Sequence, residues 1–188
     1  MPSAVWGDSS WWLDGSPSML RSNLGRRAIT ATQGNVAALT TQVMASVALP
    51  LEAGDVVTSL TFVSATTAAG TPTNWWFALY SAAATPALLA QTADQTSTAW
   101  AANTAKTVAL SSPQTILTSG VYYAAIMVKA TTVPTLAGLT LHDAVLAGAI
   151  ITGQKVLGMT SGSALTTTAP ATIASPTTVA TIPLVFAS

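Results

Sequence analysis

The residues able to take part in catalysis are few. The chain of 188 residues has one histidine, His142, followed directly by Asp143, and it has no cysteine. A His-Asp pair serves nucleophilic catalysis only when a nucleophile is held beside the imidazole, and no GxSxG motif is present to supply one. Such a dipeptide is more often a polar pair at a turn or strand end. We therefore expect no catalytic residues and a protein that is not an enzyme.

Metal ligands are equally sparse. The acidic residues are Glu52 and five aspartates, which are too scattered to predict a calcium-binding loop. Without cysteine there is no thiolate ligand for zinc. Two carboxylates that cleave sugars would have to converge from distant positions, and the sequence favours no pair. We expect neither a metal nor another cofactor.

The tryptophans carry more information. Trp75 and Trp76 are adjacent, so in a strand their side chains point to opposite faces, one inside and the other outside or under a loop. Trp100 follows in a loop-like stretch. An exposed indole can stack on a sugar ring, which makes all three candidates for binding a ligand such as a glycan. The alternative is that all three complete the core or pack under loops.

The first 27 residues differ from the rest of the chain. They contain all three arginines and three of the six tryptophans, interrupted by glycine and proline, and show no sustained helical or strand period. We predict an extended arm over residues 1–27 that orders on a partner. Tryptophan and arginine are enriched at interface hot spots, so the predicted docking residues are Trp6, Trp11, Trp12, Arg21, Arg26 and Arg27. The alternative is that the arm folds back over an open edge of its own domain. The segment does not resemble a secretory signal, and we expect it to remain in the mature protein.

From residue 28 onward, runs of Thr, Val, Ile and Leu alternate with Gly, Pro and Asn, as several short strands do. The predicted strands are 28–33, 36–49, 56–65, 74–80, 87–92, 105–110, 121–130 and 179–186. Turns are predicted at Pro50 to Gly54 and at Ser119-Gly120. Strands without alternating helices predict an all-β domain over 28–188, a jelly-roll-like antiparallel β-sandwich.

Alternation within 56–65 assigns Val56, Leu60 and Phe62 to the inward face, with Thr58 as an exception. The wider predicted core adds residues from two other strands: Phe77, Leu79, Tyr123, Ile126 and Val128.

Three regions after residue 138 are less regular. Leu141, Val145 and Ala149 have helical spacing, so a helix over 139–151 competes with an irregular structure. Residues 158–178 are rich in Thr, Ala and Pro and predict a long surface loop. Pro183 should confine the last strand to an edge or a bulge.

Charge is scarce and balanced. Six basic and six acidic residues make up 6% of the chain, against about 25% in an average soluble domain. This composition gives no attraction to nucleic acid, and no apolar run reaches the roughly 18 residues of a membrane-spanning helix. Low net charge removes repulsion between copies, so we expect self-association.

Four stretches carry a resemblance to a known group: AGDVVTSLTF, NWWFALYS, WAANTAKT and SGVYYAAIMV. Over residues 36–137 the chain resembles β-sandwich virion proteins of tailed bacteriophages that infect actinobacteria. The resemblance implies a capsid decoration or minor capsid protein located in the virion, with the major capsid protein or other virion proteins as partners and a trimer as the favoured homo-oligomer. We expect such a protein to bind the outer surface of a phage head through its N-terminal arm and the base of its domain. It carries over no catalytic residue.

Two other functions compete with this one. A minor tail protein, or a receptor-binding or carbohydrate-binding module, would use the tryptophans at 75, 76 and 100. A β-sandwich hydrolase or lyase would have to use the single histidine.

Overall fold

The strands form where β-branched and aromatic residues lie between turn residues. In the computed structural model, residues 20–24, 35–36 and 39–188 are described. Every strand pair within this part is antiparallel. The prediction of an all-β sandwich is confirmed, and the jelly-roll connectivity stays a prediction.

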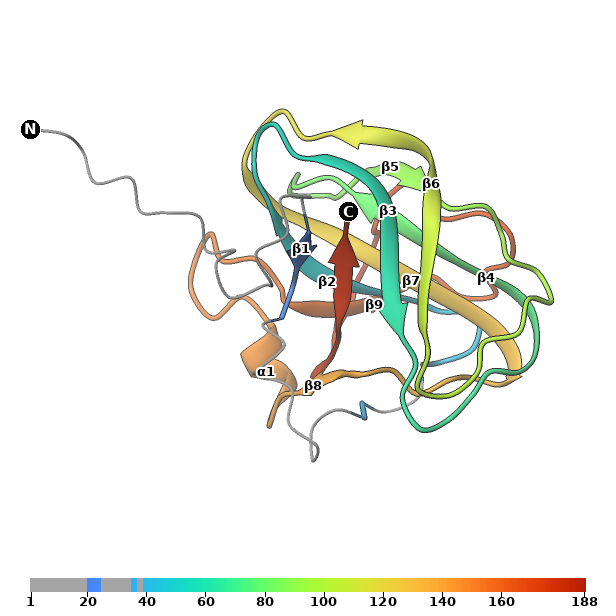
Figure 1. Cartoon of the computed structure of the whole chain (residues 1–188). Coiled ribbons are helices and arrows are strands. Elements are labelled where there is room, and N and C mark those ends of the chain that lie inside the picture. Colours follow the sequence, from blue (N-terminus) through green and yellow to red (C-terminus); the bar gives the residue numbers. More distant parts are fainter. Residues whose placement is uncertain (1–19, 25–34, 37–38) are drawn as a thin grey trace, which may run out of the picture.

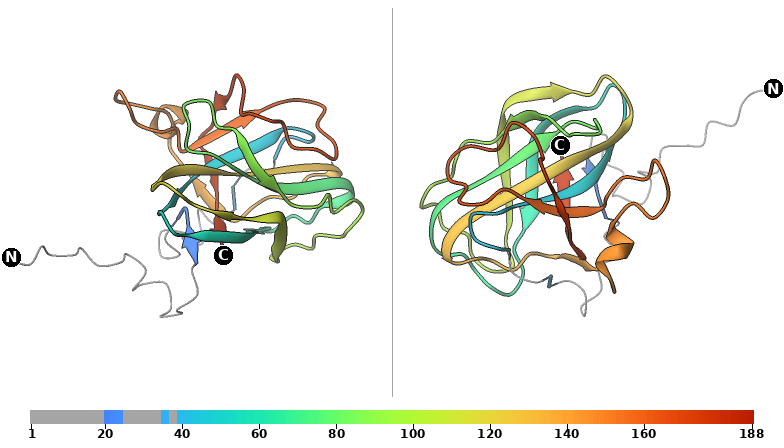
Figure 2. Two further views of the ribbon diagram at one scale, coloured as in Figure 1. Left: turned by 90° about the horizontal axis from the view of Figure 1, so that it is seen from above. Right: turned by 180° about the vertical axis from the view of Figure 1, so that it is seen from behind.

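Two sheets form the layers of the sandwich (Figures 1 and 2). The four-stranded sheet has the order β1 (Arg21–Ser22), β12 (Val185–Ala187), β3 (Val56–Val63) and β6 (Ala105–Thr115). The six-stranded sheet has the order β10 (Thr177–Thr178), β9 (Gly158–Ser161), β2 (Met44–Leu51), β7 (Gly120–Thr132), β4 (Gly70–Tyr80) and β5 (Leu88–Gln91). A separate pair joins β11 (Thr181–Pro183) to β8 (Gly138–Thr140).

The six-stranded sheet is buried on both faces. Its inner face meets the four-stranded sheet in the main core, to which Leu49, Phe77 and Ile126 belong. Its outer face carries a second cluster that includes Trp76, Tyr80 and Tyr123. Burial on both faces explains why β7 has an almost continuous apolar sequence.

Seven of the eight predicted core residues are buried, and Val56 is the exception. Val56 is 41% exposed, whereas its neighbour Val57 is completely buried. The pairing of β3 with β6 shifts between Val57 and Ser59. Because such an irregularity breaks strict alternation, the inward positions are 57, 60 and 62. The assignment of Val56 to the inward face was wrong for this reason.

The predicted final strand is divided between two sheets. β11 pairs with β8, whereas β12 lies between β1 and β3. Leu184, between the two strands, donates its backbone N–H to Ala137 O at 2.8 Å. Pro183 ends β11 in the two-stranded sheet, so its predicted edge position is confirmed.

The region after residue 138 is more ordered than its sequence indicates. Only Ala144–Ala147 is helical (α1), so the longer helix over 139–151 does not form. The predicted surface loop 158–178 begins and ends in strands, because β9 pairs with β2 and β10 pairs with β9. The predicted strand 28–33 lies outside the described residues.

Candidate functional site

Trp75 and Trp100 are part of the main core. Their rings lie 5.1 Å apart, and both pack against Phe77. The Trp75 indole donates to Thr98 O at 2.9 Å, and the Trp100 indole donates to Thr104 O at 3.0 Å. Both indoles are therefore buried with their N–H groups satisfied, and they fix the connection between β5 and β6.

Trp76 lies on the opposite face of β4, beneath the segment that joins β9 to β10. Its indole donates to Thr166 O at 2.8 Å, and the nearby Tyr80 hydroxyl donates to Pro170 O at 2.7 Å. Ile173 of the same segment is buried against this cluster. Burial raises the pKa of the Tyr80 hydroxyl well above its usual value. The segment is a hydrogen-bonded cover over the sheet.

The expectation that one of the adjacent tryptophans lies outside or under a loop is met by Trp76 under the cover. The glycan-binding role for Trp75, Trp76 and Trp100 does not fit the structure, because all three side chains are buried. An indole stacks on a sugar only when its face is accessible. The alternative interpretation, that they complete the core and pack under loops, describes their positions.

His142 and Asp143 stand at the start of α1. The Asp143 carboxylate accepts a hydrogen bond from the Val145 backbone N–H at 3.0 Å, as an N-cap residue does. The His142 side chain is exposed. Asp143 thus caps the start of α1.

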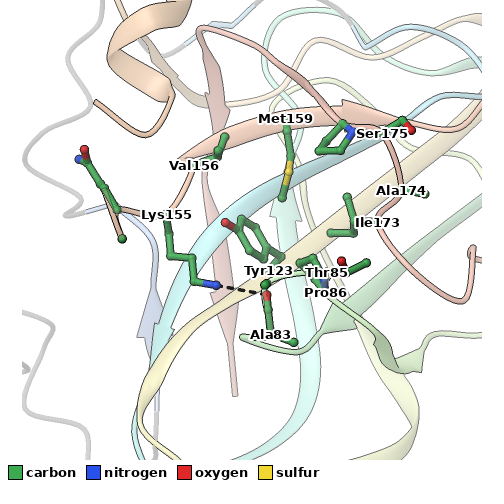
Figure 3. Close-up of a pocket in the computed structure, with 14 residues that line it drawn as sticks. Ala83, Thr85, Pro86, Tyr123, Lys155, Val156, Met159, Ile173, Ala174 and Ser175 are labelled. Carbon is green, nitrogen blue, oxygen red and sulfur yellow. Dashed lines mark hydrogen bonds between the residues drawn. The ribbon is translucent and has the colours of Figure 1, made fainter. Parts of the chain in front are cut away.

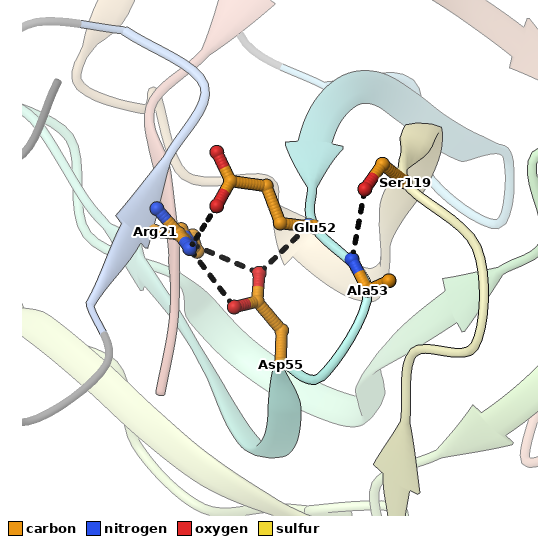
Figure 4. A network of polar contacts seen from close by, with 5 residues as sticks. All are labelled: Arg21, Glu52, Ala53, Asp55 and Ser119. Atoms are coloured by element: carbon orange, nitrogen blue, oxygen red, sulfur yellow. Dashed lines mark hydrogen bonds and ion pairs between the residues drawn. The ribbon is translucent and has the colours of Figure 1, made fainter. Parts of the chain in front are cut away.

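Of the six predicted docking residues, the structure describes only Arg21 (Figure 4). Its guanidinium donates from Nε and Nη2 to the two oxygens of Asp55, both at 2.9 Å. Nη2 also reaches Glu52 at 3.0 Å. Arg21 therefore has ion-pair partners within its own chain, and its role in docking to a partner stays a prediction. Trp6, Trp11, Trp12, Arg26 and Arg27 lie outside the described residues.

The ion pairs of Arg21 help to attach residues 20–24 to the sandwich. β1 pairs with β12, and the Asn23 side chain donates to Pro183 O at 2.7 Å and accepts from Val185 N at 2.9 Å. Leu24 packs against the main core. This part of the predicted arm covers the edge of the four-stranded sheet, as the fold-back alternative anticipated.

An apolar surface begins in α1 and continues after it. Five of the eight large apolar side chains exposed in the described part of the chain lie between residues 145 and 157. We call this set the apolar segment: Val145, Leu146, Ile150, Ile151 and Leu157. Exposure reaches 67% at Val145 and 71% at Ile151. Exposed apolar side chains grouped in this way mark surfaces that bind a partner.

The apolar segment is fixed to the sandwich at both ends. Buried Ala147 accepts a backbone hydrogen bond from Leu157, which in turn accepts one from Ala48 of β2. Between them, Gln154 Oε1 accepts from the N–H groups of Ile150 and Ile151 at 2.9 and 3.4 Å. Sequence reasoning missed this surface, although the run LTLHDAVLAGAII was the available signal.

Beside the apolar segment is a pocket of about 560 Å³ (Figure 3). Residues from 83–86, 153–156 and 173–176 surround it, and Tyr123 and Met159 of the six-stranded sheet also line it. Burial raises the pKa of Tyr123, while a hydrogen bond with the Val156 backbone acts in the opposite direction. The volume is within the range of about 300–1,000 Å³ found for ligand pockets.

Two further features are absent from the described residues. No group of three or more His, Cys, Asp or Glu side chains is arranged there to hold a metal ion. None of the helices in this part is long and apolar enough to cross a membrane.

Comparison with known proteins assigns no family: no family model matches the chain, and no curated protein matches it. The resemblance to phage virion proteins therefore rests on the four sequence stretches alone.

Proposed function

We propose that this chain is a non-enzymatic structural protein of a phage virion, specifically a capsid decoration or minor capsid protein that attaches to the outer surface of the head. The virion assignment comes from the sequence resemblance over residues 36–137. The structural observation that carries the binding role is the exposed apolar segment.

The apolar segment suits attachment by burial of surface. Residues 144–157 have a single charged side chain, Lys155. Their exposed Val, Leu and Ile side chains gain free energy when a partner removes them from water, about 1.5–3 kcal/mol for each fully buried side chain. The hydrogen bonds of Ala147 and Gln154 hold the segment in place before binding, which lowers the entropy lost on association.

The remainder of the fold provides a scaffold. The three buried tryptophans fix the connections at the two faces of the six-stranded sheet. Long-range antiparallel pairing holds the apolar segment on β2. A virion component needs such a rigid body to present one surface to its neighbours.

The test is binding to heads from a deletion strain of the parent phage, which lack this protein. Labelled chain is mixed with the heads, which are then pelleted, and the bound fraction is measured against concentration. We expect saturable binding. The double variant Ile150→Ser, Ile151→Ser should bind at least about tenfold more weakly, because two apolar contacts are lost.

Leu117→Ser is the matched control. Leu117 is also a highly exposed apolar residue, but it lies outside the apolar segment, between β6 and β7. Its replacement should leave binding unchanged. Absence of saturable binding by the wild-type chain would refute the decoration role, and equal losses for the two variants would refute the role of the apolar segment.

A further inference from the structure

The pocket beside the apolar segment has walls that are hydrogen-bonded to one another. Lys155 donates from Nζ to Ala82 O at 2.8 Å and to Ala83 O at 3.1 Å (Figure 3). The backbone N–H of Ile173, in the third loop, donates to Pro86 O at 2.9 Å. The loops are therefore held in place without a ligand, and a preformed pocket loses little entropy on binding.

Two hydrogen-bond donors face this pocket without an acceptor for every proton. The ammonium group of Lys155 has three donors, and its two carbonyl partners leave one direction open. Tyr123 is only 3% exposed, and its ring lies beside the Lys155 side chain (Figure 3). The Val156 backbone N–H donates to the Tyr123 hydroxyl oxygen. The hydroxyl proton itself has no acceptor within the part of the chain that the structure describes.

These donors also lack a negative partner among the described residues. Neither ion pair found there involves Lys155, and no Asp or Glu side chain lines the pocket. The side-chain carbonyl of Gln154 is close in sequence, but it accepts from the backbone of Ile150 and Ile151. A buried hydroxyl and an ammonium group together favour a ligand with a negatively charged acceptor.

The remaining walls of the pocket are suited to an apolar group. Pro86, Val156, Met159 and Ile173 line it with hydrocarbon and thioether surface. An inorganic anion would leave this surface in water, whereas an attached apolar group would cover it. The thioether of Met159 also packs favourably against an aromatic ring. The pocket thus combines the features that recognise a carboxylate joined to an apolar group.

We propose that the pocket binds a small ligand that ends in a carboxylate attached to an apolar group, such as a phenyl ring on a short chain. The carboxylate accepts hydrogen bonds from Lys155 and Tyr123, and the apolar group packs against Met159 and Ile173. This inference goes beyond the proposed function and does not rest on it, because it concerns the isolated chain and requires no phage particle.

The test is NMR spectroscopy of the full chain with ¹³C-labelled methionine methyl groups. Met159 lines the pocket, whereas Met44 and Met127 lie in the same buried cluster without lining it. The probe is sodium 3-phenylpropionate, added at constant pH and ionic strength. We expect a saturable change in the Met159 methyl signal, larger than the changes at Met44 and Met127. The variant Met159→Leu identifies the signal.

Matched ligands separate the two halves of the recognition. 3-Phenylpropionamide has the same shape without the charge, and acetate has the charge without the apolar group. Each should bind at least about tenfold more weakly than 3-phenylpropionate. N-Acetylphenylalanine carries the same chemistry as the last residue of a polypeptide. An affinity equal to that of 3-phenylpropionate or higher indicates a polypeptide end as the source, and a loss of about tenfold indicates a free acid.

Matched variants assign the donors. Lys155→Gln and Tyr123→Phe should each weaken binding of 3-phenylpropionate by about tenfold. Lys106→Gln, on β6 of the other sheet, should leave it unchanged. The comparison of acid and amide uses the wild-type chain and so does not depend on the folding of a variant. The proposal is overturned by absence of a saturable change at Met159, by equal affinities for acid and amide, or by equal losses for the two lysine variants.

Discussion

The contact between Arg21 and the turn after β2 gives the sharpest prediction for stability. Replacing Arg21 with Ala removes two charge-assisted hydrogen bonds to Asp55 and one to Glu52. The two carboxylates differ in environment, since the side chain of Asp55 is 7% exposed and that of Glu52 is 65% exposed. The Arg21 guanidinium therefore takes part in one ion pair with a buried carboxylate and in another with an exposed carboxylate, so the contributions of the two pairs to stability can be compared.

The exposures set the expected magnitudes. Removing one partner of a fully buried ion pair costs about 3–5 kcal/mol, because a charge stays in a poorly solvated site. The Arg21 side chain is itself 20% exposed, so we expect Arg21→Ala to lower the free energy of unfolding by about 2–4 kcal/mol. Glu52→Gln should cost less than about 1 kcal/mol, as exposed pairs do.

The assay is urea denaturation followed by tryptophan fluorescence, to which the three buried indoles contribute. Arg21→Lys is the matched control for charge, because lysine keeps the charge but cannot make the two-pronged contact. Arg21→Lys should lower the free energy of unfolding by more than Glu52→Gln and by less than Arg21→Ala. A loss below about 0.5 kcal/mol for Arg21→Ala, or an equal loss for Glu52→Gln, would refute the reasoning.

Three further predictions concern the core, alkaline stability and association. Trp100→Ala should lower the free energy of unfolding by about 3–5 kcal/mol, measured by the same denaturation, because it opens a cavity beside Trp75; a neutral effect would contradict its place in the core. Burial raises the pKa of Tyr80, so the folded state keeps a proton that the unfolded state loses above pH 10. The free energy of unfolding should fall as the pH rises above that value. Urea denaturation at increasing pH should show a less steep fall for Tyr80→Phe than for the wild-type chain, and identical slopes would contradict this. In sedimentation at micromolar concentration the chain should associate, with the trimer that the resemblance implies; wild-type monomers alone would refute association.

The all-β class and most of the core could be predicted from the sequence because alternation and turn residues are local signals. Leu60 and Phe62 were assigned correctly on that basis. Val56 was not, because the irregular pairing of β3 with β6 shifts the alternation by one residue. Such an irregularity depends on the partner strand, which the pattern within one strand does not reveal.

The placement of the tryptophans required tertiary information. Adjacent positions predict opposite faces for Trp75 and Trp76, but not that both faces are covered. The cover over Trp76 comes from a Thr-rich and Pro-rich segment about 90 residues away in sequence, through a hydrogen bond to Thr166. A composition typical of a surface loop gave no sign of this contact.

The surfaces around the candidate site were missed for a related reason. Arg21 pairs with Asp55, which lies 34 positions away in the sequence. The residues next to Arg21 in the sequence do not reveal this partner, and the tryptophans and arginines among them predicted an external one. The apolar run 139–151 has the spacing of a longer helix, but α1 ends at Ala147 and leaves Ile150 and Ile151 exposed. The pocket is formed by three separate loops, and no short motif marks it.

The central claim is that this chain is a structural component on the outside of a phage head. The most direct measurement is cryo-electron microscopy of intact particles from the parent phage, compared with particles from the deletion strain. The claim predicts density of the size of this sandwich on the outer surface of the head, with the apolar segment facing the shell, and loss of that density in the deletion strain. Heads of identical appearance in the two strains, or a difference confined to the tail, would contradict it.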